Sequence, residues 1–152
     1  MGEGDADIRR ATPADARAIR DLTRAAYARW VPVIGREPKP MAADYDAAAR
    51  HHLIDLLHVS GELAALVETI PAADHLLIEN VAVAPAFQGR GYGRKLMAHA
   101  EQLAVSLGHT ETRLYTNKLF EENVRLYRRL GYRVDREEAF KDGFVVHMSK
   151  VL

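Results

Sequence analysis

The sequence contains no cysteine among its 152 residues. Disulfide bonds, metal sites built on thiolates and a cysteine nucleophile are therefore excluded. It also lacks an excess of either charge, since 21 Lys and Arg residues balance 21 Asp and Glu residues. A domain that binds nucleic acid is usually strongly basic, so we expect no nucleic-acid partner.

Long apolar runs are missing as well, and no stretch approaches the roughly 18 residues that a membrane-spanning helix needs. Residues 1–7 are polar and acidic, without the apolar segment of a signal peptide, and we expect them to be frayed. Residues 8–152 have the length of one domain. With 48% apolar and 28% charged residues, the composition predicts a cytoplasmic globular protein that does not contact membranes.

The hydrophobic periodicity predicts a single α/β domain with a central sheet of about seven strands and about four flanking helices. Thr12 and Pro13 mark the start of the first helix, which we expect to end at Val31 and Pro32. Residues 31–43 are expected to form a long loop. Strands are expected at 8–10, 53–59, 63–70, 75–83, 112–116, 132–135 and 144–150, and further helices at 42–50, from the glycine-rich turn to 107, and at 121–130.

A glycine-rich turn between a strand and a helix is the strongest signal for function. Glycines let the backbone approach a ligand closely, and a helix N-terminus favours phosphate. The spacing is neither that of a Walker motif nor that of the dinucleotide-binding fingerprint. The turn predicts a pyrophosphate cradle made of three glycines and three basic residues: Gly89, Gly91, Gly93, Arg90, Arg94 and Lys95.

This turn resembles the pyrophosphate loop of the GCN5-related N-acetyltransferases (GNAT), Q/R-x-x-G-x-G/A, with Gln88, Gly91 and Gly93 at the defining positions. The resemblance covers residues 8–152 and implies the GNAT fold, acetyl-CoA as co-substrate and N-acetyltransferase activity. In that family the strand before the loop is bulged and pairs with the pantetheine arm. The cofactor-binding residues implied here are Val81, Val83, Gln88, Gly89, Arg90, Gly91, Tyr92, Gly93, Arg94 and Asn123.

A second motif supports the resemblance. Asn123 and Tyr127 are four residues apart on an expected helix, so both project from one face. In the family the matching tyrosine is the general acid that protonates the departing thiolate, and a phenol is protonated at neutral pH. The acceptor amine must lose a proton before it attacks, and both Glu79 and a water chain that ends at Glu79 are candidates for the base.

The acceptor pocket is expected to come from the first helices and the loop between them. An aromatic wall with Arg36 and an acid would suit a small primary amine that carries a carboxylate. Two alternatives stay open: a peptide or protein acceptor, and a sensor that binds acyl-CoA without transferring the group. The candidate residues are Tyr27, Trp30, Arg36, Glu37, Met41, Asp44, Tyr45 and, from a later strand, Tyr115.

Other groups of polar residues carry weaker signals. The adjacent His51 and His52 lack metal-ligand spacing, so no metal site is expected. His147 fits a packing or surface position, and the arginines at 125, 128 and 129 fit a solvated helix face. Homodimers are common in the family, and the sequence leaves both a monomer and a homodimer open.

Overall fold

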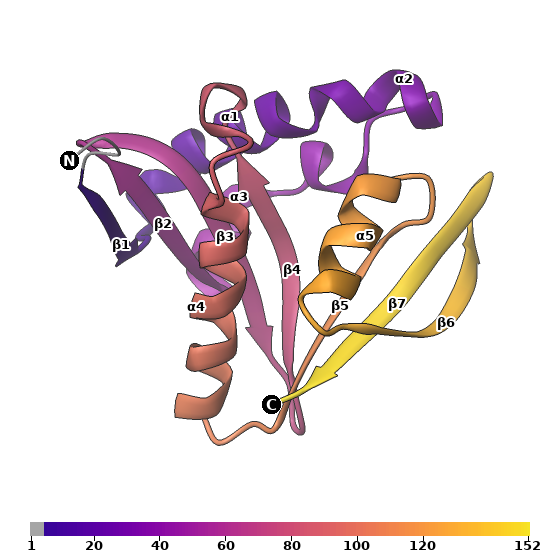
Figure 1. Ribbon diagram of the computed structural model, residues 1–152. Coiled ribbons are helices and arrows are strands. Elements are labelled where there is room, and N and C mark those ends of the chain that lie inside the picture. Colours follow the sequence, from indigo (N-terminus) through magenta and orange to yellow (C-terminus); the bar gives the residue numbers. More distant parts are fainter. Residues whose placement is uncertain (1–4) are drawn as a thin grey trace.

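A computed structural model describes residues 5–152 as one mixed sheet of seven strands, in the order β1-β2-β3-β4-β5-β7-β6 (Figure 1). The first strand begins at Ala6, two residues before its expected start, and residues 1–4 of the segment expected to be frayed lie outside the described residues. The strands are β1 Ala6–Arg10, β2 Leu53–Val59, β3 Glu62–Pro71, β4 Leu76–Val83, β5 Glu111–Asn117, β6 Arg133–Phe140 and β7 Gly143–Val151.

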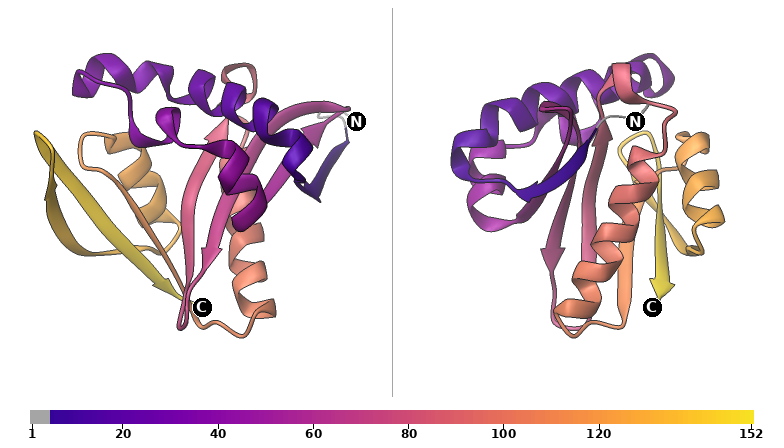
Figure 2. Two further views of the ribbon diagram at one scale, coloured as in Figure 1. Left: turned by 180° about the vertical axis from the view of Figure 1, so that it is seen from behind. Right: turned by 60° about the vertical axis from the view of Figure 1, so that its left-hand side comes forward.

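Helices cover both faces of this sheet. In Figures 1 and 2, α1 and α3 lie on one face, and α4 and α5 lie on the other. The predicted α/β class, with about seven strands and four principal helices, is confirmed. None of the helices described is long and apolar enough to span a membrane. The helices are α1 Ala16–Tyr27, the short α2 Val31–Ile34, α3 Tyr45–His51, α4 Tyr92–Ser106 and α5 Glu121–Arg129.

Each face of the sheet has its own hydrophobic core. On one face, Leu96 and Met97 of α4 are buried against Val67 of β3. On the other face, Ile19 of α1 is buried against Leu56 of β2. Burial of one such side chain contributes roughly 1.5–3 kcal/mol, so the two clusters hold α4 and α1 against opposite faces of the same strands.

The segment after α1 differs from the sequence prediction. The helical path does not end at Val31 and Pro32, because a 3-10 turn at Ala28–Trp30 leads into α2 with the proline in its first turn. A proline is tolerated there because the first N–H groups of a helix have no intrahelical partner. Gly35, with a φ of 75°, ends α2. The expected loop 31–43 therefore contains α2 and a second 3-10 turn, Lys39–Ala42.

Strands β4 and β5 pair only at one end. Their parallel pairing runs from Leu76 opposite Thr112 to Ile78 opposite Leu114. In the described part of the chain no strand lies between the rest of β4 and the rest of β5, and the two diverge in Figure 1. The sheet is therefore split beyond Ile78.

A β-bulge lies where the split begins. In the pairing of β3 with β4, Glu68 is opposite Asn80 while Thr69 is opposite Ile78, so Glu79 is the extra residue. Ile78 and Val81 both pack with the core on the α4 face. Glu79 and Asn80 both line a cavity on the opposite face. The family resemblance implied a bulge in this strand, and the structure has one.

Candidate active site

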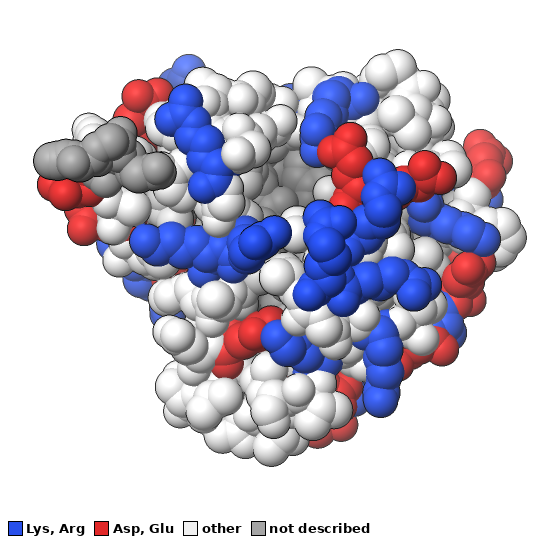
Figure 3. All heavy atoms as spheres, in the orientation of Figure 1, with Lys and Arg blue, Asp and Glu red and all other residues white. Residues whose placement is uncertain are grey.

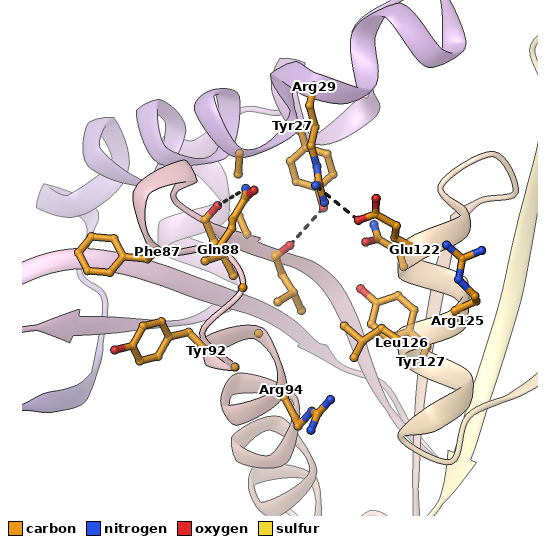
Figure 4. A pocket seen from close by; sticks show the side chains of 18 of the residues that line it. Tyr27, Arg29, Phe87, Gln88, Tyr92, Arg94, Glu122, Arg125, Leu126 and Tyr127 are labelled. Atoms are coloured by element: carbon orange, nitrogen blue, oxygen red, sulfur yellow. Dashed lines mark hydrogen bonds and ion pairs between the residues drawn. The ribbon is translucent and has the colours of Figure 1, made fainter. Parts of the chain in front are cut away.

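A cavity of about 620 Å³, the first cavity, lies between the end of β4, the start of α4 and the inner face of α5 (Figure 4). It lies at the split between β4 and β5. Val81 and Val83 line it from the strand, and Asn123 and Tyr127 line it from α5. The turn before α4 contributes Gln88, Gly89 and Gly91, and the first turn of α4 contributes Tyr92, Gly93 and Arg94. The two sequence motifs, far apart along the chain, therefore line one cavity.

The glycine-rich turn leaves the start of α4 open to a ligand. Gly91 is the N-cap with a φ of 84°, and no side chain caps the helix. The first N–H groups of the helix thus have neither an intrahelical partner nor a capping side chain. Gln88 Nε2 donates to the carbonyl oxygen of Val83 at 3.0 Å, which ties the turn to the end of β4.

Two residues of the turn take positions that the sequence did not indicate. The Tyr92 side chain is 6% exposed and packs in the core, where its ring meets Phe87 edge to face. In Figure 4 this side chain points away from Tyr127, so only the backbone of Tyr92 faces the cavity. Arg90 does not line the first cavity, and its guanidinium lies 5.5 Å from the centre of the Phe87 ring.

Positive charge surrounds the first cavity from several elements. Figure 3 shows Lys and Arg side chains gathered on both sides of a hollow between α4 and α5. The arginines that line the cavity are Arg29, Arg94, Arg125 and Arg129. The interpretation of the α5 arginines as a solvated face was therefore incomplete. Arg125 and Arg129 are four residues apart and share one side of α5, offset by two residues from Asn123 and Tyr127, and all four line the first cavity.

Two tyrosines face each other across the first cavity. Tyr27 extends from α1 and Tyr127 from α5, each towards the centre of the cavity (Figure 4). The Tyr27 hydroxyl donates to Oδ1 of Asn80 at 2.9 Å. Desolvation raises the pKa of Tyr127 to about 12 and that of Tyr27 well above its ordinary value. Both phenols are therefore protonated across the usual working range of pH.

A cavity of about 540 Å³, the second cavity, lies on the α1 and α3 face of the sheet. Glu79, Asn80 and Tyr115 form part of its sheet side, and the segment after α2 covers it with Arg36 and Lys39. Tyr27 lines both cavities. The two cavities therefore approach the split from opposite faces of the sheet and share one side chain.

Glu79 in the second cavity belongs to a chain of hydrogen bonds. The Tyr115 hydroxyl donates to Oε1 of Glu79 at 2.6 Å and accepts from Nζ of Lys39 at 3.0 Å. Burial is the main cause that raises the pKa of Tyr115, and the hydrogen bond to Glu79 adds to it. Tyr115 therefore remains a donor that fixes the position of the Glu79 carboxylate.

Most of the predicted acceptor residues line the second cavity, but three do not. Trp30 is buried at the edge of the first cavity and stacks on Phe120 with ring centres 4.5 Å apart. Met41 is 6% exposed in the core, and Glu37 is exposed and pairs with Arg24 at 2.7 Å. The predicted residues that do line the second cavity are Tyr27, Arg36, Asp44, Tyr45 and Tyr115.

Sequence reasoning missed several polar residues of the second cavity. Glu68 is 4% exposed, and His52 and His147 also line this cavity. His147, expected at a packing or surface position, is partly exposed and lies 2.9 Å from Glu138. The signal for Glu68 was present, because a carboxylate among the apolar residues of a central strand needs a partner. No group of three potential metal ligands occurs among residues 5–152.

Comparison with known proteins agrees with the site. The model of the Acetyltransferase (GNAT) family matches residues 17–132, so the chain belongs to this family. Among curated proteins, the mycothiol acetyltransferase of Nocardia farcinica (strain IFM 10152) is 33% identical over 123 residues. That match covers 80% of this chain, and this chain spans only 38% of the length of that relative.

Solved structures share the fold over almost the whole chain. The PaiA N-acetyltransferase of Thermoplasma acidophilum, in complex with coenzyme A, is 17% identical with a TM-score of 0.81, and the match covers 97% of this chain and 99% of that chain. The ribosomal-protein-S18-alanine N-acetyltransferase of Escherichia coli is 20% identical with a TM-score of 0.79, and the match covers 97% and 94%. Both have the same fold as this protein.

Proposed function

We propose that the protein is an acetyl-CoA-dependent N-acetyltransferase that acetylates the primary amine of a small molecule. The observation that carries this proposal is the pair of cavities that reach the split sheet from opposite faces and share Tyr27. Two substrates can occupy these cavities together, with their reacting ends at the split. Such an arrangement supports direct transfer within a ternary complex.

The first cavity fits coenzyme A. The uncapped start of α4 and the left-handed Gly91 suit a pyrophosphate, and Arg94, Arg125 and Arg129 can neutralise further phosphate charge. Val81 and Val83 offer strand backbone and apolar surface to the pantetheine arm. When bound, acetyl-CoA supplies an acetyl group activated as a thioester.

In this proposal Tyr127 donates the proton that the departing thiolate needs. Its pKa of about 12 keeps that proton in place over the working range of pH. Asn123, one turn before it on the same side of α5, orients the cofactor arm. Because the sequence has no cysteine, an acyl-cysteine intermediate is excluded, and this favours direct transfer over a ping-pong route.

The acceptor side favours a small amine over a peptide. The segment from α2 to the 3-10 turn at Lys39–Ala42 covers the second cavity, whereas a peptide needs an open groove. Glu79 can hold an ammonium group near the split, and Arg36 can bind a carboxylate on the same molecule. In the described residues Arg36 has no salt bridge, and its guanidinium lies 5.7 Å from the centre of the Phe140 ring.

Release of free thiol from acetyl-CoA tests the proposal. A panel of amino acids, other small amines and peptides is assayed with the wild-type protein. We expect turnover with small primary amines and little with peptides. Preference for peptide N-termini or lysine side chains would reassign the acceptor, and tight acetyl-CoA binding without thiol release from any amine would indicate a sensor.

Arg36→Ala tests the carboxylate contact. If Arg36 binds a carboxylate on the acceptor, this change should raise KM for carboxylated amines about tenfold and leave KM for neutral amines near the wild-type value. The measurement is initial-rate kinetics with each amine and its matching amide. An unchanged KM for the carboxylated acceptor contradicts this contact.

A further inference from the structure

Glu68 is a buried carboxylate for which the proposed mechanism has no use. It lies in the middle of β3, is 4% exposed, and lines the second cavity. It pairs across the sheet with Asn80, the residue that accepts a hydrogen bond from Tyr27 where the two cavities meet. Burial of a carboxylate is costly, so its place beside the split calls for a chemical explanation.

The partner of Glu68 connects it to solvent. Oε2 of Glu68 lies 2.5 Å from Nδ1 of His52, within hydrogen-bond distance. His52 is the C-cap of α3, and its side chain is 29% exposed. An imidazole can take up a proton at one nitrogen and release another from the second nitrogen.

Glu79 lacks a comparable exit for a proton. Its contact to Tyr115 leads on to Lys39, whose ammonium group donates to the Tyr115 oxygen. An ammonium group has donors only and cannot accept a proton from Tyr115. The Tyr115 hydroxyl must therefore point to Glu79, and a proton placed on Glu79 cannot leave along this chain.

We propose that Glu68 and His52 form a proton relay that removes the proton of the acceptor amine. This inference rests on the proposed function. The acceptor N–H bond breaks, its electron pair stays on nitrogen for the attack, and the proton bonds to Oε1 of Glu68. The pair starts as a Glu68 carboxylate and a His52 imidazolium; the proton on Nδ1 stays hydrogen-bonded to Oε2, and the proton on Nε2 passes to water. The net charge of the pair is unchanged, and Glu79 serves as the fixed anion that holds the amine.

The surroundings of Glu68 support its role as an acceptor of protons. Burial raises its pKa, and the hydrogen bond from His52 opposes this in part. A base works best when its pKa lies near the working pH, so the upward direction is the useful one. The other groups that act on Glu68 electrostatically, or are influenced by it, are Lys39, Glu79, Tyr27, Tyr45 and Tyr115.

His52→Ala tests the relay. At neutral pH, where the acceptor is an ammonium ion, we expect kcat to fall about 100-fold while KM for acetyl-CoA stays unchanged. Added imidazole should restore much of the rate, because the lost side chain is partly exposed. The loss of kcat in His52→Ala should become smaller as the pH approaches the pKa of the amine, because the amine then binds already deprotonated. Glu68→Gln should show the same pH dependence without rescue by imidazole.

A matched control uses another imidazole–carboxylate pair. His75 Nδ1 lies 2.7 Å from Asp74 Oδ1 in the turn between β3 and β4, and neither residue lines a cavity described above. His75→Ala should therefore keep the wild-type kcat, and added imidazole should not change it. A second readout does not need turnover. Amine binding to the wild type should release a proton, seen by calorimetry in two buffers, and Glu68→Gln should abolish this release.

The outcomes separate the two proposals. Rates within twofold of wild type for both His52→Ala and Glu68→Gln would overturn the relay while thiol release still supports the acetyltransferase. A loss of rate that imidazole does not restore, equal at every pH, would also overturn it and indicate a structural role for His52. A wild type that binds amine with proton release but never frees thiol would contradict the proposed function and leave the relay supported.

Discussion

Two tyrosines at this site differ in whether their hydroxyl proton is already used in a hydrogen bond to a carboxylate. Within residues 5–152 no charged group hydrogen-bonds to the Tyr127 hydroxyl, and desolvation alone raises the pKa of Tyr127 to about 12. Tyr115 has a similar environment, but its proton is committed to Glu79. The same residue type therefore fits an acid at one position and a positioning group at the other.

Tyr127→Phe is the direct test at the residue scale. It removes one hydroxyl and keeps the ring that meets Tyr132 edge to face, so the fold should be unchanged. We expect kcat to fall about 100-fold or more, the size typical of general acid catalysis. Steady-state thiol release gives the rate, and thermal unfolding checks the fold. A kcat within twofold of wild type would remove Tyr127 from the mechanism.

The pH dependence of the wild type follows from the same pKa. Because the folded Tyr127 keeps its proton until the pH approaches about 12, no loss of rate from this group is expected at moderately alkaline pH. Rate measurements between neutral pH and about pH 10 check this, the upper limit being the ordinary pKa of tyrosine. If the rate falls near pH 10 in the wild type but not in Tyr127→Phe, the pKa of Tyr127 is that of an ordinary phenol.

At the scale of elements, two helix starts differ in how their first backbone N–H groups are satisfied. The first helical turn begins with a capping box in which Asp15 accepts from the backbone of Thr12 at 2.8 Å and from Arg9 at 3.0 Å. The start of α4 has no such cap. A structural helix start is satisfied by its own side chains, whereas the start of α4 leaves its donors for a ligand.

Asp15→Asn should destabilise the protein at neutral pH by about 1 kcal/mol, the usual size of a capping contribution. The folded Asp15 has a pKa of about 2, against an ordinary value of 3.8, because of its hydrogen bond with Arg9. The contribution of ionised Asp15 to the free energy of unfolding is complete above about pH 4 and is lost as the pH falls towards 2. Denaturant unfolding at a series of pH values measures it. A difference from wild type that does not shrink at acid pH would contradict this origin.

Gly91→Ala should weaken coenzyme A binding through backbone strain. The residue is left-handed, and a Cβ added there meets nothing within 4 Å, so strain and not collision is the expected effect. For a residue with a side chain this conformation costs about 1–2 kcal/mol, and relief of the strain would move the N–H groups of α4. Calorimetry with coenzyme A should show the loss. Gly143→Ala, without a positive φ and with open space, is the control.

At the scale of the whole molecule, neutrality conceals an uneven distribution of charge. The formal net charge is zero, yet four arginines and one glutamate line the first cavity, whereas four carboxylates, one arginine and one lysine line the second. The split between β4 and β5 separates these two regions. The positive charge of the molecule is thus concentrated at the first cavity, where the proposed function places the phosphates of coenzyme A.

Added salt should weaken coenzyme A binding more than it would if the first cavity carried no net charge. Raising ionic strength from about 0.05 to about 0.5 M shortens the screening length, so affinity should fall several-fold. Arg125→Ala combined with Arg129→Ala should reduce both the affinity and its salt dependence. Calorimetric titrations at several salt concentrations measure this. Equal salt dependence in wild type and double variant would exclude these arginines from the phosphate site.

Much of the fold and half of the site could be predicted from the sequence. The order of elements and the glycine-rich turn follow from local patterns, and Gln88, Gly91 and Tyr127, which these patterns single out, line one cavity. Trp30 was misplaced because its partner, Phe120, is 90 residues away along the chain. Glu68 and His52 were missed for the same reason, since their pairing depends on how α3 meets β3.

The bulge in β4 has a consequence for comparing this chain with its relatives. Because Glu79 is an extra residue, a version of the strand without it would keep Val81 and Val83 on the same face as Ile78. A relative that lacks this carboxylate can therefore differ by a one-residue gap in an alignment, with no substitution at all. Deletion of Glu79 should accordingly give a folded protein that still binds coenzyme A, with its acceptor specificity changed.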